Sequence, residues 1–416
     1  MRDKNAVNSV RGYRVVLKPR EELRLRRGHP WVYDNEIAFV EGDPPAGAET
    51  ALFDSRGSFI GKGFFNPSSK IRLRLYSRTT EKADKAFFIK SFNQALFWRR
   101  RFFDDTKESL RLVFGEADNL PGLIVDLFIG RADAGDTEPG AMGRWLSCQF
   151  LSLGVELRKA EIVQSLVEVF EPDGIVERSE APVRALEGLE ASSGLLYGSV
   201  PENVLIKEGN AVFLVDLSEG QKTGWFLDQR ANRAAAARFA AGAEVLDVFC
   251  NQGGFGILAA MAGAAHVTAV DSSRGALAAA ARNATLNGVE SRYSTIEANA
   301  FDYLRNLEKE KAKFDLIILD PPAFAKSRSS VEQAYKGYKE INLRAMRLLN
   351  RGGLLVSCSC SYWFDEQRFQ TMIEDAAFDC GRKIRLIEAR TQDMDHPIVS
   401  GYPESKYLKC RILELR

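Results

Sequence analysis

The spacing of apolar and polar positions divides the chain into three parts. From about residue 13 to 77, short strand-like runs separated by Gly, Pro and Ser predict a small β-barrel. From about 81 to 200, a helical pattern, strands and a second helical pattern indicate an α+β region. Beyond a predicted hairpin at 203–217, apolar runs alternate with helical patterns, as in an α/β sheet. We therefore predict domains over 1–80, 81–200 and 201–416.

Two segments of the central part look structural. The helical pattern at 85–105 carries many aromatic residues at helical spacing, which we interpret as core side chains and not as a platform for stacking bases. The segment 131–144 is rich in Gly, Asp and Ala and predicts an extended surface hairpin, from which nothing follows about function.

The stretch VLDVFCNQGGFG, residues 245–256, is an apolar run that ends in an acid and opens into a glycine-rich turn. This pattern predicts a parallel strand that feeds a helix, with a ligand site at the carboxyl end of the strand. Gly253 and Gly254 let the backbone pass close to a cofactor, and Gly256 allows tight packing of helix on strand. The next strand ends in Asp271, whose carboxylate can accept hydrogen bonds from both hydroxyls of a ribose. A nucleoside-containing cofactor is therefore predicted.

Two cofactors compete for this site. Residues 254–259 satisfy the relaxed G-x-G-x-x-A fingerprint of nicotinamide dinucleotides, with Asp271 at a suitable distance. Asp247, followed by Phe249 and Asn251, places an acid near the mouth, which repels a pyrophosphate but suits the positively charged S-adenosylmethionine. The glycine motif alone does not decide between them.

The strand FDLIILDPPAFAKS, residues 314–327, favours S-adenosylmethionine. It ends in Asp320-Pro321-Pro322, and the two prolines hold the chain extended and withhold two N–H donors. Asp320 is therefore expected to face the cleft above the sheet. A single Asp-Pro pair is commonly only a turn, but this motif follows a cofactor-type pair of strands.

A thiol is expected at the same edge of the sheet. A helix with apolar residues at helical spacing runs to Gly352-Gly353, and the strand LLVSCSCS follows. Cys358 is expected to pack within the strand, whereas Cys360, one step beyond and flanked by serines, is the candidate reactive thiol. The remaining cysteines are interpreted as small buried hydrophobes: Cys148, Cys250, Cys380 and Cys410.

With these motifs in hand, the C-terminal half resembles a class I S-adenosylmethionine-dependent methyltransferase. The whole chain resembles the bacterial 23S ribosomal RNA cytosine-5 methyltransferases that carry an N-terminal PUA domain. The matching segments are RGHPWVYDNEI (27–37), FGEADNLPGLIVD (114–126), GQKTGWFLDQRANR (220–233), the cofactor strands, the Asp-Pro-Pro turn, YKGYKEINLRAMRLL (335–349), SCSCS (357–361) and DHPIVSGYPESKYLK (395–409). The segment 131–144 looks like an insertion relative to this family.

The resemblance implies an α/β fold: a Rossmann-like seven-stranded sheet, an N-terminal PUA-like β-barrel and a central α+β domain. The last strand of the seven-stranded sheet, 407–415, should run antiparallel to its neighbours and pair with 383–390. Asn299 stands where many such enzymes have an acid that receives the adenine amine, and an amide oxygen can still accept that bond.

The site residues implied are Cys360 and Asp320 for catalysis, with no metal. The implied cofactor-binding residues are Asp247, Phe249, Asn251, Gly253, Asp271, Ser272, Asn299, Ala300, Asp320, Phe226, Asp228 and Arg230.

Composition sets outer limits. The 416 residues, 45% of them hydrophobic, suffice for two or three packed domains. The net charge of +1 does not by itself indicate that the protein binds nucleic acid. Basic residues cluster nevertheless at 18–27 and 99–101, and the resemblance favours an RNA-binding role for the first cluster. The six cysteines form no C-x-x-C pair, and the three histidines are scattered, His29 and His396 being interpreted as turn residues. Without a signal peptide or membrane span, a cytoplasmic location is expected.

The favoured function is methylation of carbon 5 of a cytosine in ribosomal RNA, with S-adenosylmethionine as cofactor. Carbon 5 becomes nucleophilic only after a nucleophile adds to carbon 6, so a thiolate is required. Methylation of a base nitrogen such as one in guanine, methylation of uracil at carbon 5, and a non-catalytic RNA-binding assembly factor are the alternatives. The expected partner is 23S ribosomal RNA, and a homodimer is left open.

Overall fold

The computed structural model describes residues 12–133, 140, 142–217, 224–325 and 327–416. The chain forms two compact units. Unit 1 comprises 1–206, 215–225 and 394–405, and unit 2 comprises 207–214, 226–393 and 406–416. The predicted boundaries at 80 and 200 stay predictions.

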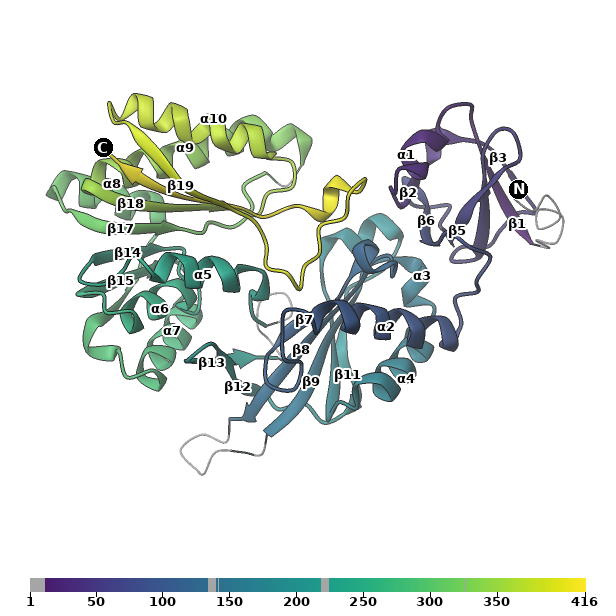
Figure 1. The fold of residues 1–416 in the computed structure, drawn as a ribbon, viewed down its shortest axis with the longest axis horizontal. Helices are drawn as coiled ribbons and strands as arrows, with labels where there is room; N and C mark the ends of the chain where they lie inside the picture. The colour runs from purple at the N-terminus through teal and green to yellow at the C-terminus, as the bar shows by residue number, and fades with distance from the viewer. Residues whose placement is uncertain (1–11, 134–139, 141, 218–223, 326) are drawn as a thin grey trace. The chain divides into compact units, whose positions relative to one another are not determined.

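Unit 1 begins with a six-stranded sheet of order β2-β6-β5-β4-β1-β3 (Figure 1). Only β1 and β4 pair in parallel; the other neighbours are antiparallel. Its elements are β1 (Tyr13–Leu17), α1 (Glu22–Arg26), β2 (Trp31–Tyr33), β3 (Ile37–Glu41), β4 (Glu49–Phe53), β5 (Phe59–Phe65) and β6 (Ile71–Ser77). Apolar side chains from all of these strands except β3 form its core, with Ile37 of β3 packed against it. The predicted small β-domain is confirmed.

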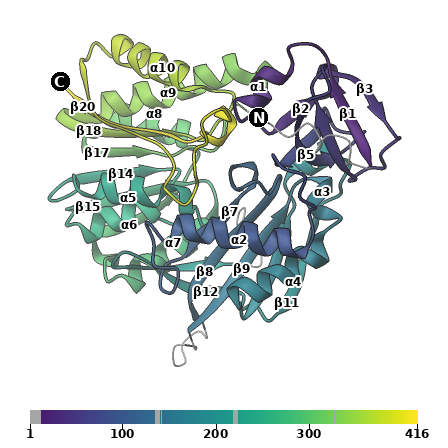
Figure 2. The same cartoon turned by 45° about the vertical axis from the view of Figure 1, so that its right-hand side comes forward.

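A second sheet, of order β11-β10-β9-β8-β12-β13 with β7 paired to β8, carries helices α2 and α4 (Figure 2). The elements are α2 (Lys85–Arg99), β7 (Leu110–Phe114), β8 (Leu123–Ala132), β9 (Met142–Phe150), α3 (Leu153–Glu156), α4 (Lys159–Phe170), β10 (Gly174–Ser179), β11 (Ser192–Gly198), β12 (Asn203–Glu208) and β13 (Ala211–Asp216). The predicted hairpin at 203–217 is confirmed as β12 and β13. In the predicted hairpin at 131–144, Arg131 pairs with Met142, while 134–139 and 141 lie outside the described residues.

The prediction that the aromatic residues at 85–105 are all core was wrong for part of the segment. Phe88 and Phe92 are fully buried, but Phe97, Trp98 and Phe102 are 65%, 38% and 45% exposed. Phe97 and Trp98 lie within α2 but not among its buried residues, which include Phe88, Phe92, Leu96 and Arg99, and Phe102 lies beyond the end of the helix. The number of aromatic residues in this segment therefore exceeds what one buried helix face can hold.

Unit 2 is built on a sheet of order β16-β15-β14-β17-β18-β20-β19 (Figure 1). The first five strands pair in parallel, and β20 is antiparallel to both β18 and β19. The strands are β14 (Glu244–Val248), β15 (His266–Asp271), β16 (Tyr293–Glu297), β17 (Phe314–Leu319), β18 (Leu349–Ser359), β19 (Ile384–Arg390) and β20 (Lys409–Leu415). The predicted seven strands, with a reversed last strand, are confirmed.

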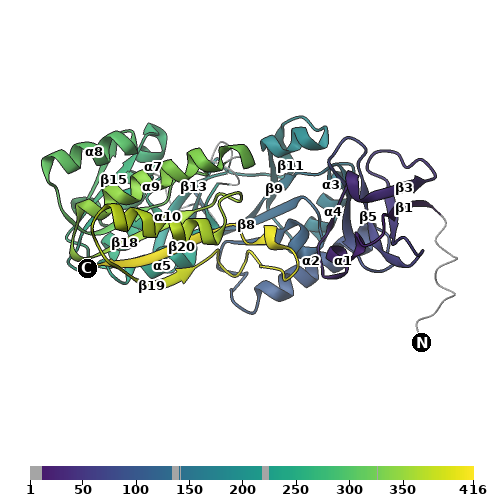
Figure 3. The same ribbon diagram turned by 90° about the horizontal axis from the view of Figure 1, so that it is seen from above.

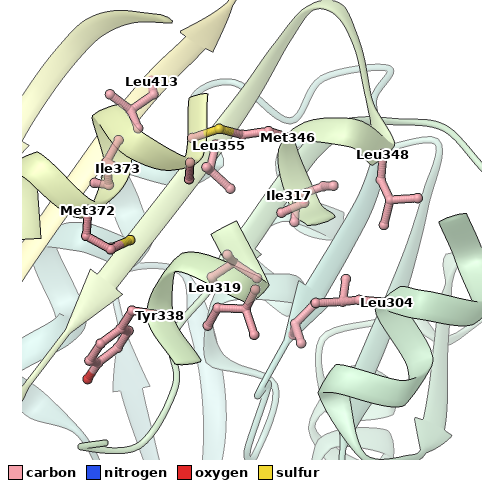
Figure 4. Close-up of a cluster of buried hydrophobic side chains, with 14 of the residues drawn as sticks. Leu304, Ile317, Leu319, Tyr338, Met346, Leu348, Leu355, Met372, Ile373 and Leu413 are labelled. Carbon is pink, nitrogen blue, oxygen red and sulfur yellow. The ribbon is translucent and has the colours of Figure 1, made fainter. Parts of the chain in front are cut away.

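Helices α8–α10 share one core with this sheet, and α5–α7 lie on its other face (Figures 1 and 3). They are α5 (Arg230–Ala237), α6 (Gly254–Met261), α7 (Arg274–Leu286), α8 (Ala300–Glu310), α9 (Val331–Leu348) and α10 (Glu366–Asp379). Figure 4 shows part of this core, with Tyr338 of α9 at one edge. The helix predicted to run to Gly352-Gly353 instead ends at Leu348, and Leu349 begins β18, where it pairs in register with Phe314 of β17.

Candidate functional site

The turn after β14 adopts an unusual backbone conformation. Phe249 and Asn251 have φ of 65° and 49°, and Gly253 has φ of 85°. Left-handed conformations of bulky residues are uncommon and cluster at functional sites. A Cβ on Gly253 would lie 2.6 Å from the Tyr293 hydroxyl, so the glycine is required by packing within the protein. The sequence predicted the glycine but assigned it a different reason, close approach to a ligand.

Asp247 lies inside the protein, not at the mouth of the site as predicted. Its side chain is completely buried, and Oδ2 accepts the Gly256 N–H at 2.8 Å. Oδ1 has no hydrogen-bond partner among the described residues. The pKa of Asp247 is raised to about 7, mainly by burial, with smaller contributions in the same direction from the charges of Asp320 and Asp271. The carboxyl group therefore holds the first turn of α6 beneath the glycine loop.

Asp271 ends β15, as predicted, and is partly exposed. Its Oδ2 accepts the Asn251 N–H at 3.0 Å, and its Oδ1 accepts the Ser273 N–H at 2.9 Å. Each carboxylate oxygen has two acceptor sites, so both can still receive a ribose hydroxyl. The bonds fix the carboxylate relative to the glycine turn, and Ser272 beside it is exposed.

Asn299 precedes α8 and caps it. Its Oδ1 accepts the N–H groups of Phe301 and Asp302 at 3.0 and 3.3 Å. These bonds occupy both lone pairs of the amide oxygen, so an adenine amine would have to displace one of them. The predicted contact of Asn299 with adenine stays a prediction, and the neighbouring Ala300 is buried as the first residue of α8.

The segment that follows residues 220–223, which lie outside the described residues, forms the short 3-10 helix Leu227–Gln229 and leads into α5. Phe226 is partly buried at its start. Asp228 is buried and accepts a hydrogen bond from the Tyr407 hydroxyl. Arg230, the first residue of α5, lies 3.7 Å from the Asp393 carboxylate. All three nominated residues thus lie in one turn of chain.

The sequence did not predict the amides that support Asp320. Gln229 Nε2 donates to Asp320 Oδ1 at 2.9 Å, and Gln229 Oε1 accepts from Asn232 Nδ2 at 2.7 Å. Asn232 is fully buried, and its Oδ1 accepts from Arg390 Nε at 3.0 Å. The signal available was the repeated polar spacing in FLDQRANR, where residues 229 and 232 are three apart within one helical turn.

Asp320 and the thiols meet at one edge of the sheet. Asp320 follows the last residue of β17, and Leu319 before it pairs with Ser357 in β18. Cys358 lies within β18 opposite Cys410 of β20 and is buried. A hydrogen bond to Cys410 and burial raise the pKa of the Cys358 thiol, so this thiol is protonated at neutral pH. Cys360 comes after the strand and is partly exposed.

A cluster of hydroxyl groups fixes the chain around Cys360. Ser359 and Ser361 both hydrogen-bond to the Tyr338 hydroxyl, at 3.0 and 2.8 Å. Ser361 Oγ also accepts the Ala325 N–H at 3.2 Å, which connects the strand end to the chain after Asp-Pro-Pro. Because the side chains on both sides of Cys360 are held by one tyrosine, the strand end is rigid where the thiol projects.

The residues at this edge fit S-adenosylmethionine. Asp271 has acceptor capacity left for a ribose, and the buried Oδ1 of Asp247 lies behind the glycine turn. No group of three or more His, Cys, Asp or Glu side chains able to hold a metal occurs among the described residues. Across the same residues, every helix is too short or too polar to span a bilayer.

Comparisons with known proteins agree with this geometry. A family model described as a PUA-like domain matches residues 15–78, and one described as an S-adenosylmethionine-dependent methyltransferase matches residues 189–382. The fold class is confirmed, and the cofactor is S-adenosylmethionine, which removes the nicotinamide alternative.

Solved structures show the same fold. A SAM-dependent methyltransferase from Streptococcus mutans aligns with a TM-score of 0.81 at 23% identity, covering 96% of this chain and 99% of that chain. A methyltransferase complexed with SAH aligns with the same TM-score at 24% identity and the same coverage.

Curated relatives match almost the whole chain. The ribosomal RNA large subunit methyltransferase I of Tolumonas auensis is 40% identical over 400 residues, or 95% of this chain and 97% of the relative. The protein of the same name from Klebsiella pneumoniae strain 342 is 39% identical over 406 residues, or 96% of this chain and 98% of the relative. The chain therefore belongs to the ribosomal RNA large subunit methyltransferase I family.

Proposed function

We propose that the protein methylates carbon 5 of a cytosine in 23S ribosomal RNA, with Cys360 as nucleophile. The observation that carries the proposal is the pairing of two groups at one sheet edge. Cys360 is a partly exposed thiol just beyond β18, and Asp320 is a partly exposed carboxylate just beyond the neighbouring strand β17. Methylation of a base nitrogen requires no thiol, so this arrangement favours carbon 5.

The chemistry needs a covalent bond to the base. The Cys360 thiolate adds to carbon 6, and the electrons of the C5=C6 double bond move to carbon 5. S-adenosylmethionine supplies an electrophilic methyl group, which carbon 5 takes up. A base then removes the proton from carbon 5, the double bond re-forms, and the C6–S bond breaks to release the thiolate.

Asp320 favours cytosine over uracil in this scheme. Its carboxylate is held by Gln229 and can accept a hydrogen bond from the exocyclic amine of cytosine. Uracil presents a carbonyl oxygen at that position, which a carboxylate repels. A target stacked in an RNA helix has first to be extruded, at a cost of a few kcal/mol.

The proposal includes the cofactor contacts and the partners. Asp271 and Ser272 bind the ribose, Asn299 and Ala300 border the adenine, and the turn Phe249, Asn251 and Gly253 lies against the cofactor, with Asp247 behind it. Phe226, Asp228 and Arg230 border its methionine end. Residues 1–80 add affinity for RNA, and a homodimer stays open.

The test uses 23S ribosomal RNA that carries 5-fluorocytidine. Fluorine at carbon 5 prevents the final elimination, so protein and RNA should stay covalently joined. Cys360→Ala should form no adduct and should lose methyl transfer to unmodified RNA, whereas Cys358→Ala, the matched control, should form the adduct. Mapping of the labelled methyl group should identify a 5-methylcytosine.

Other outcomes would point elsewhere. An adduct that persists in Cys360→Ala and disappears in Cys358→Ala would assign the nucleophile to the other thiol. Methylation that survives both substitutions would favour a base nitrogen, and a 5-methyluracil product would favour uracil. RNA binding without any methyl transfer by the wild-type protein would leave a non-catalytic assembly factor.

A further inference from the structure

Lys409 is a buried lysine beside the proposed nucleophile. It begins β20, opposite Ser359 of β18, and only 4% of its surface is exposed. Lysine is almost never fully buried unless its charge is paired, because desolvation of an ammonium group is costly. The location of this side chain therefore calls for a compensating interaction.

The described contacts supply no carboxylate for it. Lys409 Nζ donates to the backbone carbonyls of Ser361 at 2.8 Å and Tyr407 at 2.9 Å. The third hydrogen of the ammonium has no partner among the described residues. Glu366, the carboxylate with the largest effect on the pKa of Lys409, is ion-paired with Lys406 and Arg411.

Lys409 contacts the chain on both sides of Cys360, because it pairs with Ser359 across the strands and its Nζ bonds to the Ser361 carbonyl. The pKa of Lys409 is lowered to about 8; burial is the largest cause, and a negative charge on Cys360 is the largest effect that opposes it. Glu366 and Asp365 act in the same direction, and Lys406 acts against them. The Tyr338 hydroxyl, on the other side of the strand end, also senses the charge of Cys360.

We propose that Lys409 is a positioning residue whose ammonium group stabilises the thiolate of Cys360. The proposal rests on the proposed function of Cys360 as nucleophile. Ionisation transfers the thiol proton to solvent, Lys409 keeps its three protons, and the thiolate reappears when the C6–S bond breaks. An adjacent cation increases the thiolate fraction of a cysteine near neutral pH.

The geometry explains why this ammonium acts on the thiol and not on solvent. Its two carbonyl bonds hold Nζ at the strand end, and one of these carbonyls belongs to Ser361, the residue after Cys360. The Ser361 hydroxyl is held in turn by Tyr338, so the backbone between thiol and ammonium has little freedom. Lys409 thus remains near Cys360 before RNA arrives.

The test measures alkylation of Cys360 by iodoacetamide in the full-length protein, without RNA or cofactor, by mass spectrometry of its peptide. Lys409→Met should slow alkylation at pH 7.5 about tenfold and raise the pH of half-maximal rate by about one unit. Lys409→Arg, which keeps the charge, should retain most of the rate. Lys406→Met, which removes an exposed lysine of the same segment, should change it little.

Methylation should follow the same order, with a lower kcat for Lys409→Met and little change in KM for RNA. An alkylation rate and midpoint equal to wild type in Lys409→Met would overturn the proposal. If that variant fails to fold, Lys409→Gln, which can still donate to the carbonyls, takes its place. Because alkylation needs no RNA, its result is independent of whether Cys360→Ala abolishes methylation, so the two proposals can fail separately.

Discussion

A buried cation in each unit of the protein allows a comparison, because the two cations differ in their hydrogen-bond partners. In unit 1, Arg99 is 0% exposed and uses all five of its N–H donors. Two bind the Asp118 carboxylate at 2.6 and 2.7 Å, and the others reach the carbonyls of Arg111, Ala95 and Asp395. In unit 2, Lys409 is almost as buried but bonds only to two neutral carbonyls.

The carboxyl groups repeat this contrast. Asp126 of unit 1 is fully buried and receives two hydrogen bonds from the Arg111 guanidinium, at 2.7 and 2.8 Å. Asp247 of unit 2 is equally buried but receives one bond, from a neutral N–H. We call a charge saturated when partners within the protein fill its hydrogen-bonding capacity, and such charges stabilise the fold. Incompletely compensated charges cost stability and collect where ligands and reactions are expected, as they do at the edge of β14, β17 and β18.

The largest effect expected from this difference between Arg99 and Lys409 is on the stability of unit 1. Arg99→Met should lower the free energy of unfolding by about 3–5 kcal/mol, because it leaves Asp118 buried without its counter-charge. Urea unfolding followed by tryptophan fluorescence measures this, since four of the five tryptophans belong to unit 1. The double variant Arg99→Met/Asp118→Leu should recover part of the loss.

Lys409→Met is the matched substitution in unit 2. It should cost no more than about 1 kcal/mol, because the loss of two hydrogen bonds is offset by the removal of a poorly compensated buried charge. Equal losses for Arg99→Met and Lys409→Met would refute the distinction between saturated and unsaturated cations.

The contrast also shows what the sequence could predict. The parallel strands were predictable because burial on both faces demands continuous apolar runs, as in β14 and β17. Asp271, Asp320 and Cys360 were predictable because the carboxyl ends of such strands meet at one edge. Features of this kind can be predicted because the pattern lies within a short stretch of sequence.

Saturation, by contrast, depends on contacts far apart in the chain. Gln229 reaches Asp320 across 91 positions, and Arg99 reaches Asp395 across 296. No local pattern distinguishes Lys409 from an exposed lysine on an alternating strand, and none separates buried Arg99 from exposed Arg101. The placement of Asp247 at the mouth was wrong although its partner Gly256 lies only nine positions away, because the strand pattern does not show which side chains of β14 are buried under α6.

A smaller effect tests Asp247 through pH. Its folded-state pKa of about 7 exceeds the ordinary value of 3.8, so the folded protein holds a proton that the unfolded chain releases between these values. The contribution of Asp247 to stability is therefore full below about pH 4 and is lost as pH rises through 7, by about 1.4 kcal/mol per unit.

Asp247→Asn removes this loss and keeps an acceptor for Gly256. Relative to wild type, the cofactor-free variant should gain about 2 kcal/mol in free energy of unfolding between pH 5 and 7. Asp104→Asn serves as control, because the pKa of Asp104 is lowered to about 2 and both states are ionised over this range. A variant curve parallel to wild type would show that Asp247 is not protonated in the folded protein.

The smallest expected effect is on RNA binding by the basic cluster at 18–27, where saturated and unsaturated arginines can again be compared. Arg24 is bound to Glu36 and Arg26 to Asp54, whereas Arg20 and Arg27 are exposed and have no ion pair among the described residues. If unsaturated cations are the functional ones, Arg20 and Arg27 contact phosphates, and Arg24 supports the fold. Only the first pair should then affect the salt dependence of RNA binding.

Arg20→Ala/Arg27→Ala should therefore weaken binding of 23S ribosomal RNA and flatten the plot of log affinity against log salt concentration, by about 0.7–0.9 for each phosphate that is no longer bound. Arg24→Ala should leave that slope unchanged and lower thermal stability, because it leaves Glu36 without its ion pair and removes a hydrogen bond to the Trp31 carbonyl. Filter binding at several salt concentrations separates the two outcomes. A flatter slope in Arg24→Ala, with none in the double variant, would mean that ion pairing in the free protein does not predict which arginines meet RNA. The cluster would then exchange its internal carboxylate partners for phosphates on binding, and saturation would mark structure only in the buried parts of the molecule.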